Sequence, residues 1–260
     1  MWALRLGTPR TVTGQQVVDV VVPAALRFLL PGRDRSAGMR RLRFDPDATV
    51  GHVVQAAGVP LTEVGGLRLD GVLTDPRART SPGSRIEVTE TARPESPPGG
   101  GFVLDVGLGA LARRMRLLGL DVAWRNDADD PDLVARAVAE DRVLLTQDRR
   151  LLMRRALPRG ALVRGSRPDD QLADVLDRFS LDLAPLTRCT ACGGVLDPVP
   201  KEEVAHLLEA GTRRTYDEFV RCRACRRVYW HGAHARRIRT LIEHARMFSP
   251  PAGAGEPNRS

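Results

Sequence analysis

Four cysteines form the most specific pattern in the chain. They fall in two pairs, Cys189-x2-Cys192 and Cys222-x2-Cys225, with 29 residues between the pairs. Each pair can present two thiolates from one tight turn, and a structural Zn²⁺ takes four such ligands in a tetrahedron. We therefore predict a closed, structural zinc site in a zinc ribbon. A redox pair or unbound thiols are the alternatives.

A group of aspartates is the second feature that could do chemistry. Asp105 and Asp148 each follow an apolar segment that we expect to be a strand, and Asp129-Asp130 precede an expected helix. Ligands of an open parallel sheet bind outside the carboxyl ends of its strands, so these side chains should converge. Clustered carboxylates repel one another unless a cation neutralises them, and Mg²⁺ or Mn²⁺ prefers oxygen ligands. Such an ion activates water beside a scissile phosphate, so the pattern predicts metal-dependent phosphodiester hydrolysis.

Each aspartate also has a simpler structural explanation. Asp130 and Asp148 stand where helix N-caps are expected, and an Asp cap contributes about 1 kcal/mol. Asp105 ends an apolar strand beside Gly107 and has no equally simple capping role in the sequence. Taken singly, the residues leave both interpretations open.

Arginines surround the aspartates in the sequence. Arg113, Arg114 and Arg116 lie off the apolar face of an expected helix, and Arg149 follows Asp148. Guanidinium groups suit phosphate oxygens, so these residues are candidate contacts for the phosphates of a nucleic acid such as RNA. The alternative is an ordinary solvated helix face.

Charge and composition narrow the class of protein. The 260 residues carry a net charge of +8 and 42% hydrophobic residues, with no apolar run near the roughly 20 residues that span a bilayer. We expect a soluble, cytoplasmic protein without a membrane partner. Residues 188–246 hold 12 basic and 7 acidic side chains. With Tyr229 and Trp230 among them, this composition suits single-stranded RNA, although both rings could instead pack the ribbon onto its neighbour.

The elements that must position the aspartates alternate between strands and helices. Such alternation predicts βαβ units and a parallel sheet in an α/β/α domain over residues 102–187. Expected strands are 102–106, 121–124, 142–146 and 161–164, and expected helices are 108–118, 130–140, 149–156 and 168–179.

Residues 16–91 have a different, strand-rich pattern. Strands at 17–22, 41–44, 66–69 and 85–89, with one helix that Asp47 or Thr49 could cap, predict a ubiquitin-like β-grasp domain. Sulfur-carrier proteins of this fold end in a free diglycine, whereas Gly99-Gly100 is internal here. We therefore favour an accessory domain that docks a protein partner or RNA.

The remaining segments are poor in residues that a core could bury. Residues 92–101 are rich in Pro and Gly and predict a linker. Residues 1–15 are expected to be an extension, 188–247 a zinc ribbon with a C-terminal helix, and 248–260 a disordered tail.

The motifs of residues 102–245 resemble the Mut-seven C-terminal RNase family. This resemblance implies a PIN-like nuclease fold with a zinc ribbon, and bacterial members often carry a ubiquitin-like domain in front. It implies a metal-dependent RNase whose acidic residues correspond to Asp105, Asp129-Asp130 and Asp148, with Asp169 or Asp170 as a weaker fourth candidate. The family usually has Thr-Arg-Asp where Gln147 stands here. The motifs are Phe102-Val-Leu-Asp105, Leu108-Gly-Ala-Leu-Ala-Arg113, Met115-Arg-Leu-Leu-Gly-Leu-Asp121, Asp129-Asp130, Arg142-Val-Leu-Leu-Thr-Gln-Asp148 and the two CxxC pairs.

Three functional hypotheses follow from the sequence. The leading one is a metal-dependent ribonuclease with Zn²⁺ in its ribbon and Mg²⁺ or Mn²⁺ at its aspartates. The second is an RNA-binding or adaptor protein that keeps the fold without the chemistry. The third is a role related to sulfur transfer through the β-grasp domain.

Overall fold

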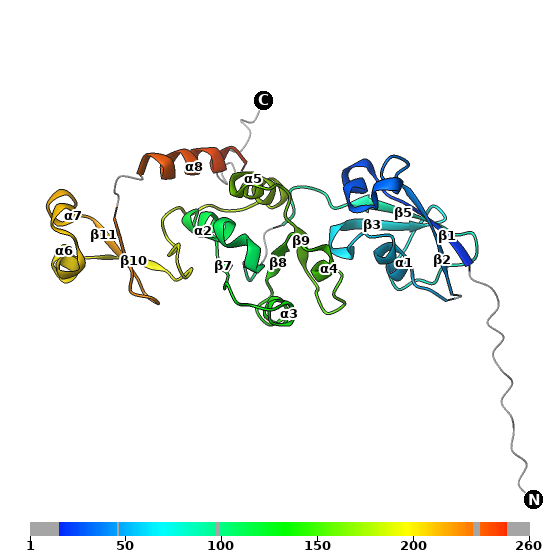
Figure 1. Cartoon of the computed structure of the whole chain (residues 1–260), viewed down its shortest axis with the longest axis horizontal. Helices are drawn as coiled ribbons and strands as arrows, with labels where there is room; N and C mark the ends of the chain where they lie inside the picture. Colours follow the sequence, from blue (N-terminus) through cyan, green and yellow to red (C-terminus); the bar gives the residue numbers. More distant parts are fainter. Residues whose placement is uncertain (1–15, 46, 97–98, 231–234, 249–260) are drawn as a thin grey trace, which may run out of the picture. The chain divides into compact units, whose positions relative to one another are not determined.

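The computed structural model describes residues 16–45, 47–96, 99–230 and 235–248 (Figure 1). The predicted N-terminal extension and residues 249–260 of the predicted tail lie outside these ranges. The chain divides into two compact units, residues 1–91 and 92–260, which we describe separately. Within the described ranges, no helix has both the length and the apolar character needed to cross a bilayer.

The first unit is a mixed sheet with one α-helix. Its strand order is β2-β1-β5-β3-β4, and β1 pairs with β5 in parallel while its other neighbour is antiparallel. Thr49 caps the helix, as one of the two predicted alternatives has it, because its hydroxyl accepts the N–H of His52 at 3.2 Å. The α-helix and strands are β1 (Gln16–Val21), β2 (Met39–Phe44), α1 (Val50–Ala56), β3 (Val64–Leu69), β4 (Val72–Leu73) and β5 (Arg85–Glu90).

A parallel sheet forms the first part of the second unit. Its four strands have the order β7-β6-β8-β9, and every pairing is parallel. The elements are β6 (Phe102–Leu104), α2 (Gly109–Leu117), β7 (Val122–Ala123), α3 (Asp130–Ala139), β8 (Val143–Thr146), α4 (Arg149–Leu152), β9 (Gly160–Leu162) and α5 (Pro168–Arg178).

Helices cover both faces of this sheet (Figure 1). The apolar faces of α2 and α5 pack together over one face, where Phe102, Leu111 and Phe179 belong to one buried cluster. On the other side, α3 contacts β6 and β8, and α4 contacts β8 and β9. The strand order reverses between β6 and β8, so the carboxyl ends of these two strands form the switch point at which open α/β sheets bind ligands.

The cysteines lie in and beside a three-stranded antiparallel sheet with the order β10-β11-β12. Two short α-helices lie between its first two strands, and a longer helix follows its last strand. Ala245 of that longer helix is buried in the same cluster as Phe102 and Leu111. The elements are β10 (Leu196–Val199), α6 (Lys201–Val204), α7 (Ala210–Thr215), β11 (Phe219–Cys222), β12 (Val228–Trp230) and α8 (Ala235–Phe248).

This architecture confirms the fold class predicted from the sequence. It has an N-terminal ubiquitin-like sheet, a parallel-sheet α/β domain, and a cysteine cluster toward the C-terminus. The strand expected over 102–106 ends at Leu104, because residues Val106–Leu108 form a 3₁₀ turn.

Part of the segment that its Pro and Gly content marks as a linker is built into the second unit. The guanidinium of Arg93 contacts the carboxylates of Asp174 at 3.0 Å and Asp177 at 2.7 Å. The side chain of Glu95 pairs at 2.6 Å with Arg178, which is only 3% exposed. Composition misses these ties because charged side chains, not apolar ones, make them.

The internal diglycine Gly99-Gly100 also packs against the second unit. Gly100 donates its N–H to the carbonyl of Asp141 at 3.2 Å. A Cβ at Gly100 would collide with the carbonyl of Glu140. The diglycine therefore has a packing role, which differs from the free terminal diglycine of a sulfur carrier.

Candidate functional site

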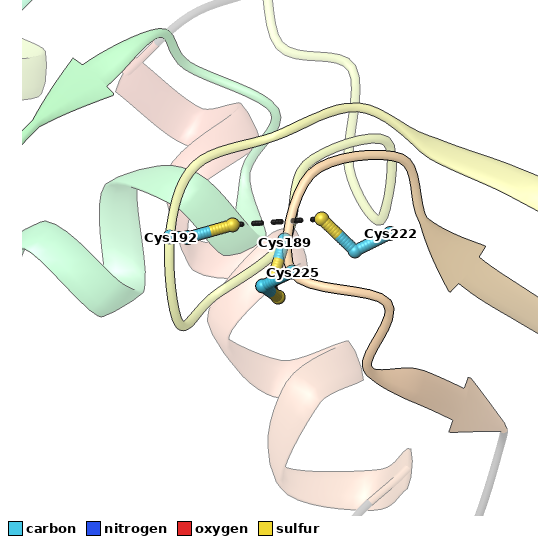
Figure 2. Close-up of side chains that lie close together, drawn as sticks. All are labelled: Cys189, Cys192, Cys222 and Cys225. Atoms are coloured by element: carbon cyan, nitrogen blue, oxygen red, sulfur yellow. Dashed lines mark hydrogen bonds between the residues drawn. The ribbon is translucent and has the colours of Figure 1, made fainter.

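The four cysteines converge from two turns of the ribbon (Figure 2). Their sulfur atoms all lie within 4.8 Å of one another, and all four thiols are free of disulfides. The Cys189–Cys225 and Cys192–Cys222 sulfur distances are 3.6 and 3.5 Å. Zn–S bonds of 2.3 Å in a tetrahedron place neighbouring sulfurs about 3.8 Å apart. Four soft ligands at this spacing are compatible with Zn²⁺.

Burial and hydrogen bonding distinguish the sulfurs from one another. Burial raises the pKa of the Cys189 thiol, but hydrogen bonds, above all with the Tyr229 hydroxyl at 3.0 Å, lower it overall to about 6. Burial raises the pKa of Cys192 to about 12. Cys189 is therefore the sulfur best stabilised as a thiolate. The Tyr229 hydroxyl therefore has a structural contact at the cluster.

Arg116 fixes the first cysteine turn to the parallel sheet. It is 1% exposed, and it donates to the carbonyls of Ala191 at 2.8 Å and Val122 at 3.0 Å. Burial lowers the pKa of this guanidinium, while the nearby thiols of Cys192 and Cys189 raise it. The predicted RNA contact of Arg116 is wrong, because its guanidinium is enclosed between the sheet and the cysteine turn.

The cysteine turn docks at the edge of the sheet opposite the predicted aspartate site. Val122 begins β7, and Leu117, whose carbonyl accepts the N–H of Leu186, ends α2. Both lie at the amino edge of the sheet, whereas Asp105 and Asp148 follow the carboxyl ends of β6 and β8. The ribbon that carries the cysteines is thus attached at the end of the sheet away from these carboxylates.

Thr146 connects the two aspartates at the switch point. This residue ends β8 and is fully buried. Its hydroxyl donates to Asp105 Oδ2 at 2.6 Å and accepts the N–H of Asp148 at 2.9 Å. The sequence interpretation missed Thr146, although a polar residue at the end of an apolar strand, two positions before an aspartate, is a usable signal.

Both aspartates at the switch point also cap short helices. Asp105 Oδ1 accepts the N–H of Val106 at 2.6 Å, and Asp148 Oδ1 accepts the N–H of Arg150 at 2.7 Å. The N-cap role predicted for Asp148 agrees with this geometry. The prediction that Asp105 has no simple capping role is wrong, because Asp105 caps the 3₁₀ turn that follows it.

The acidic pair before α3 has a different arrangement from the one expected. Asp129, rather than Asp130, is the N-cap, accepting the N–H of Asp132 at 2.9 Å. Asp130 opens the helix and pairs with Arg154 at 3.1 Å. The weaker acidic candidates also have arginine partners, since Asp169 pairs with Arg114 at 2.7 Å.

The carboxylates are spaced more widely than the cysteines. Among the residues of the described ranges, the cysteines are the one group of three or more potential ligands with ligand atoms within 4.8 Å of each other. Asp105 and Asp148 share one buried hydroxyl, while Asp129 and Asp130 stand at the start of α3 after the neighbouring β7.

Two further residues shape this edge of the sheet. The indole N–H of Trp124 donates to the carbonyl of Val106 at 3.2 Å, and a Cβ at Gly109 would meet the Trp124 ring at 2.5 Å. Gly109 therefore lets the ring cover the turn after Asp105. The amide of Gln147, where the family pattern has arginine, donates to the carbonyl of Gly165 at 2.7 Å.

The remaining predicted RNA contacts differ in exposure. Arg113 and Arg149 are exposed, whereas Arg114 is partly buried and engaged with Asp169. Arg113 and Arg149 therefore lie where a polyanion could reach them.

The second unit joins a doubly wound parallel sheet, with acidic residues at its switch point, to a ribbon that carries four clustered cysteines. In the comparison with family models, residues 100–242 match the Mut7-C RNAse domain, and residues 15–96 match the Mut7-C ubiquitin domain. The chain belongs to the Mut7-C RNase family and carries its ubiquitin-like domain. Family membership indicates a ribonuclease that acts on RNA. Comparison with curated proteins gives no match.

Proposed function

We propose that this protein hydrolyses RNA phosphodiester bonds with Mg²⁺ or Mn²⁺ held by the acidic residues at the carboxyl edge of its parallel sheet. The supporting observation is that Asp105 and Asp148 flank the point where the strand order reverses, and that the buried Thr146 hydroxyl contacts the Asp105 carboxylate and the Asp148 backbone N–H. Sheets of this kind bind their ligands at that point.

Carboxylate oxygens are the ligands that a hard divalent cation prefers. Asp105, Asp130 and Asp148 would contribute the ligand oxygens, with Asp129 assisting from the start of α3. A bound ion would acidify a water molecule and neutralise charge on the phosphate. Thr146 orients Asp105 through its hydroxyl, and the N–H groups of Val106 and Arg150 fix the orientation of the two carboxylates by hydrogen bonding to them.

The zinc ribbon contributes structure rather than chemistry in this proposal. Four thiolates leave no open coordination position for water, so the ion would stabilise the turns that carry the cysteines. The exposed arginines Arg113 and Arg149 would contact RNA phosphates.

The test compares wild-type protein with Asp105→Asn on labelled single-stranded RNA, with and without added Mn²⁺. Asparagine is also a good N-cap, so this change removes the charge and preserves the turn. We expect cleavage to fall at least about a hundredfold, since a bound cation contributes several kcal/mol to the transition state. Asp182→Asn, an exposed aspartate away from the switch point, is the matched control.

Binding of Mn²⁺, followed by electron paramagnetic resonance, gives a readout independent of turnover. We expect Asp105→Asn to weaken it and Asp182→Asn to leave it unchanged. Equal cleavage by Asp105→Asn and wild type would contradict the assignment.

A non-catalytic RNA-binding role is the competing function. It is favoured by one observation, namely that Asp105, Asp129, Asp130 and Asp148 all have capping or ion-pair partners in the structure. RNA binding without Mn²⁺-dependent cleavage would support it.

A further inference from the structure

A mainly apolar groove of about 1180 Å³ lies in the second unit, away from the aspartates. Strands of the zinc ribbon line most of it, and Leu117 at the end of α2 and Ile238 of α8 complete the wall. Its aromatic lining includes Tyr216 and Trp230, and Trp230 is 41% exposed. A large exposed ring in an apolar groove is available for contact with a partner.

We propose that this groove binds unpaired bases of the RNA substrate, with Trp230 as the main stacking surface. The inference rests on the proposed function, because it assigns the groove to the same substrate strand. Aromatic rings bind bases of single-stranded RNA by stacking, which needs no particular sequence.

Charge around the groove fits an RNA occupant. Residues 188–246 carry 12 basic and 7 acidic side chains, although the parallel-sheet segment 102–187 carries 14 of each. The groove lining holds two basic residues, Arg188 and Lys201, and two acidic ones, Asp217 and Glu218. Lys201 pairs with Asp217 at 2.7 Å and Arg188 with Asp121 at 3.0 Å, so the positive excess comes from the ribbon around the groove. The positive excess of the ribbon attracts phosphates, while the apolar floor accepts bases.

The position of the groove allows one RNA strand to contact both the groove and the aspartates. α2 has nine residues, from Gly109 to Leu117, and is therefore about 14 Å long. Its first residue lies four positions after Asp105, and its last residue lines the groove. An RNA strand held at both places can run along α2, where Arg113 is exposed. Short strands could reach the aspartates without filling the groove, and longer ones could do both.

The ribbon offers variants that separate stacking from folding. Trp230→Ala removes the ring, and Trp230→Phe keeps an aromatic surface. Leu207→Ala is the matched control, because Leu207 is 60% exposed in the same ribbon and lies outside the groove lining.

Binding is measured by fluorescence anisotropy of labelled RNA on full-length, zinc-loaded protein carrying Asp105→Asn, so that the RNA stays intact. We expect Trp230→Ala to weaken binding of single-stranded RNA at least about fivefold, with most of the affinity kept in Trp230→Phe. Leu207→Ala should change it by less than about twofold. Duplex RNA of the same sequence, whose bases cannot enter the groove, should be insensitive to Trp230→Ala.

Unchanged binding of single-stranded RNA by Trp230→Ala would overturn the proposal. It would favour an apolar protein segment as the occupant of the groove. An equal loss for duplex and single strand would also overturn it, because the ring would then act through phosphate contacts. Cleavage is measured separately with Asp105 intact, and Trp230→Ala should raise the KM of long strands but not of short ones. Stacking without any cleavage would contradict the proposed ribonuclease activity and support the RNA-binding groove. Cleavage without stacking would support the activity and contradict the groove.

Discussion

The cysteine cluster and the aspartate edge are both candidate metal sites, but the fold prepares them differently. The cysteine sulfurs already lie at the spacing of a zinc tetrahedron. The carboxylates instead cap helices or pair with arginine, and they are more widely spaced. A structural ion belongs to the folded state, because its binding free energy is folding free energy. A catalytic ion must leave room for water and substrate. Its carboxylate ligands can therefore be held by caps and ion pairs until the ion replaces these partners.

The largest effect should follow loss of the ribbon's metal. Cys222→Ser removes one buried ligand, and apparent zinc-binding energies of about 10–16 kcal/mol are typical of structural sites. We expect hydrogen exchange to become rapid across β10, β11 and β12 and to stay slow in the ubiquitin-like unit. Thr190→Ala, which keeps all four sulfurs, is the control. Slow exchange in zinc-free ribbon would show that the cluster is not structural.

The next largest effect concerns the contact between the ribbon and the sheet. Arg116→Met leaves the carbonyls of Ala191 and Val122 without their donor, so we expect a loss of about 2–5 kcal/mol in the free energy of unfolding of the second unit. Arg113→Met, on the exposed part of the same helix, should change it by less than about 0.5 kcal/mol. Urea unfolding measures both. Similar values for the two variants would contradict the buried role of Arg116.

A smaller effect is expected at the aspartate edge. Thr146→Val keeps the shape of the side chain but removes the hydroxyl shared by Asp105 and the Asp148 N–H. We expect a loss of about 1–3 kcal/mol in unfolding free energy and a fall in cleavage rate, because Asp105 loses its orienting donor. Thr146→Ser should recover both. A Thr146→Ser protein as impaired as Thr146→Val would point to packing instead.

The smallest expected effect is a change in the pKa of one carboxyl group, that of Asp170, at the same edge of the sheet. The hydrogen bonds of Arg167 hold the pKa of Asp170 below its usual value. Stabilisation by this pair is therefore present above the unfolded pKa of about 3.9 and is lost as the pH falls through the folded pKa. Nuclear magnetic resonance of the Asp170 carboxyl should show a midpoint that rises in Arg167→Gln. The same midpoint in both proteins would contradict this electrostatic pairing.

The sequence predicts those features that local chemistry determines. The two CxxC pairs specify their cluster because each turn supplies two ligands. Asp148 was predictable as a cap because a helix directly follows a recognisable strand.

The missed features depend on residues distant in the sequence or on short turns. Arg116 contacts Ala191, which is 75 residues away, so its burial cannot be read from the arginine pattern of α2. Asp105 caps a 3₁₀ turn of three residues, too short to produce a periodic pattern. The groove needs α2, the ribbon and α8 together, and none of these segments indicates it alone.

The salt bridges of Arg93 and Glu95 have a consequence for dissecting the chain. A fragment that starts at the glycine triplet Gly99–Gly101 would lose both residues, and with them the ion pair between Glu95 and Arg178, which is 3% exposed. Starting at Ala92 retains these pairs, and it coincides with the boundary between the two compact units. Expression of the second unit alone should therefore begin several residues earlier than the Pro- and Gly-rich composition of the segment suggests.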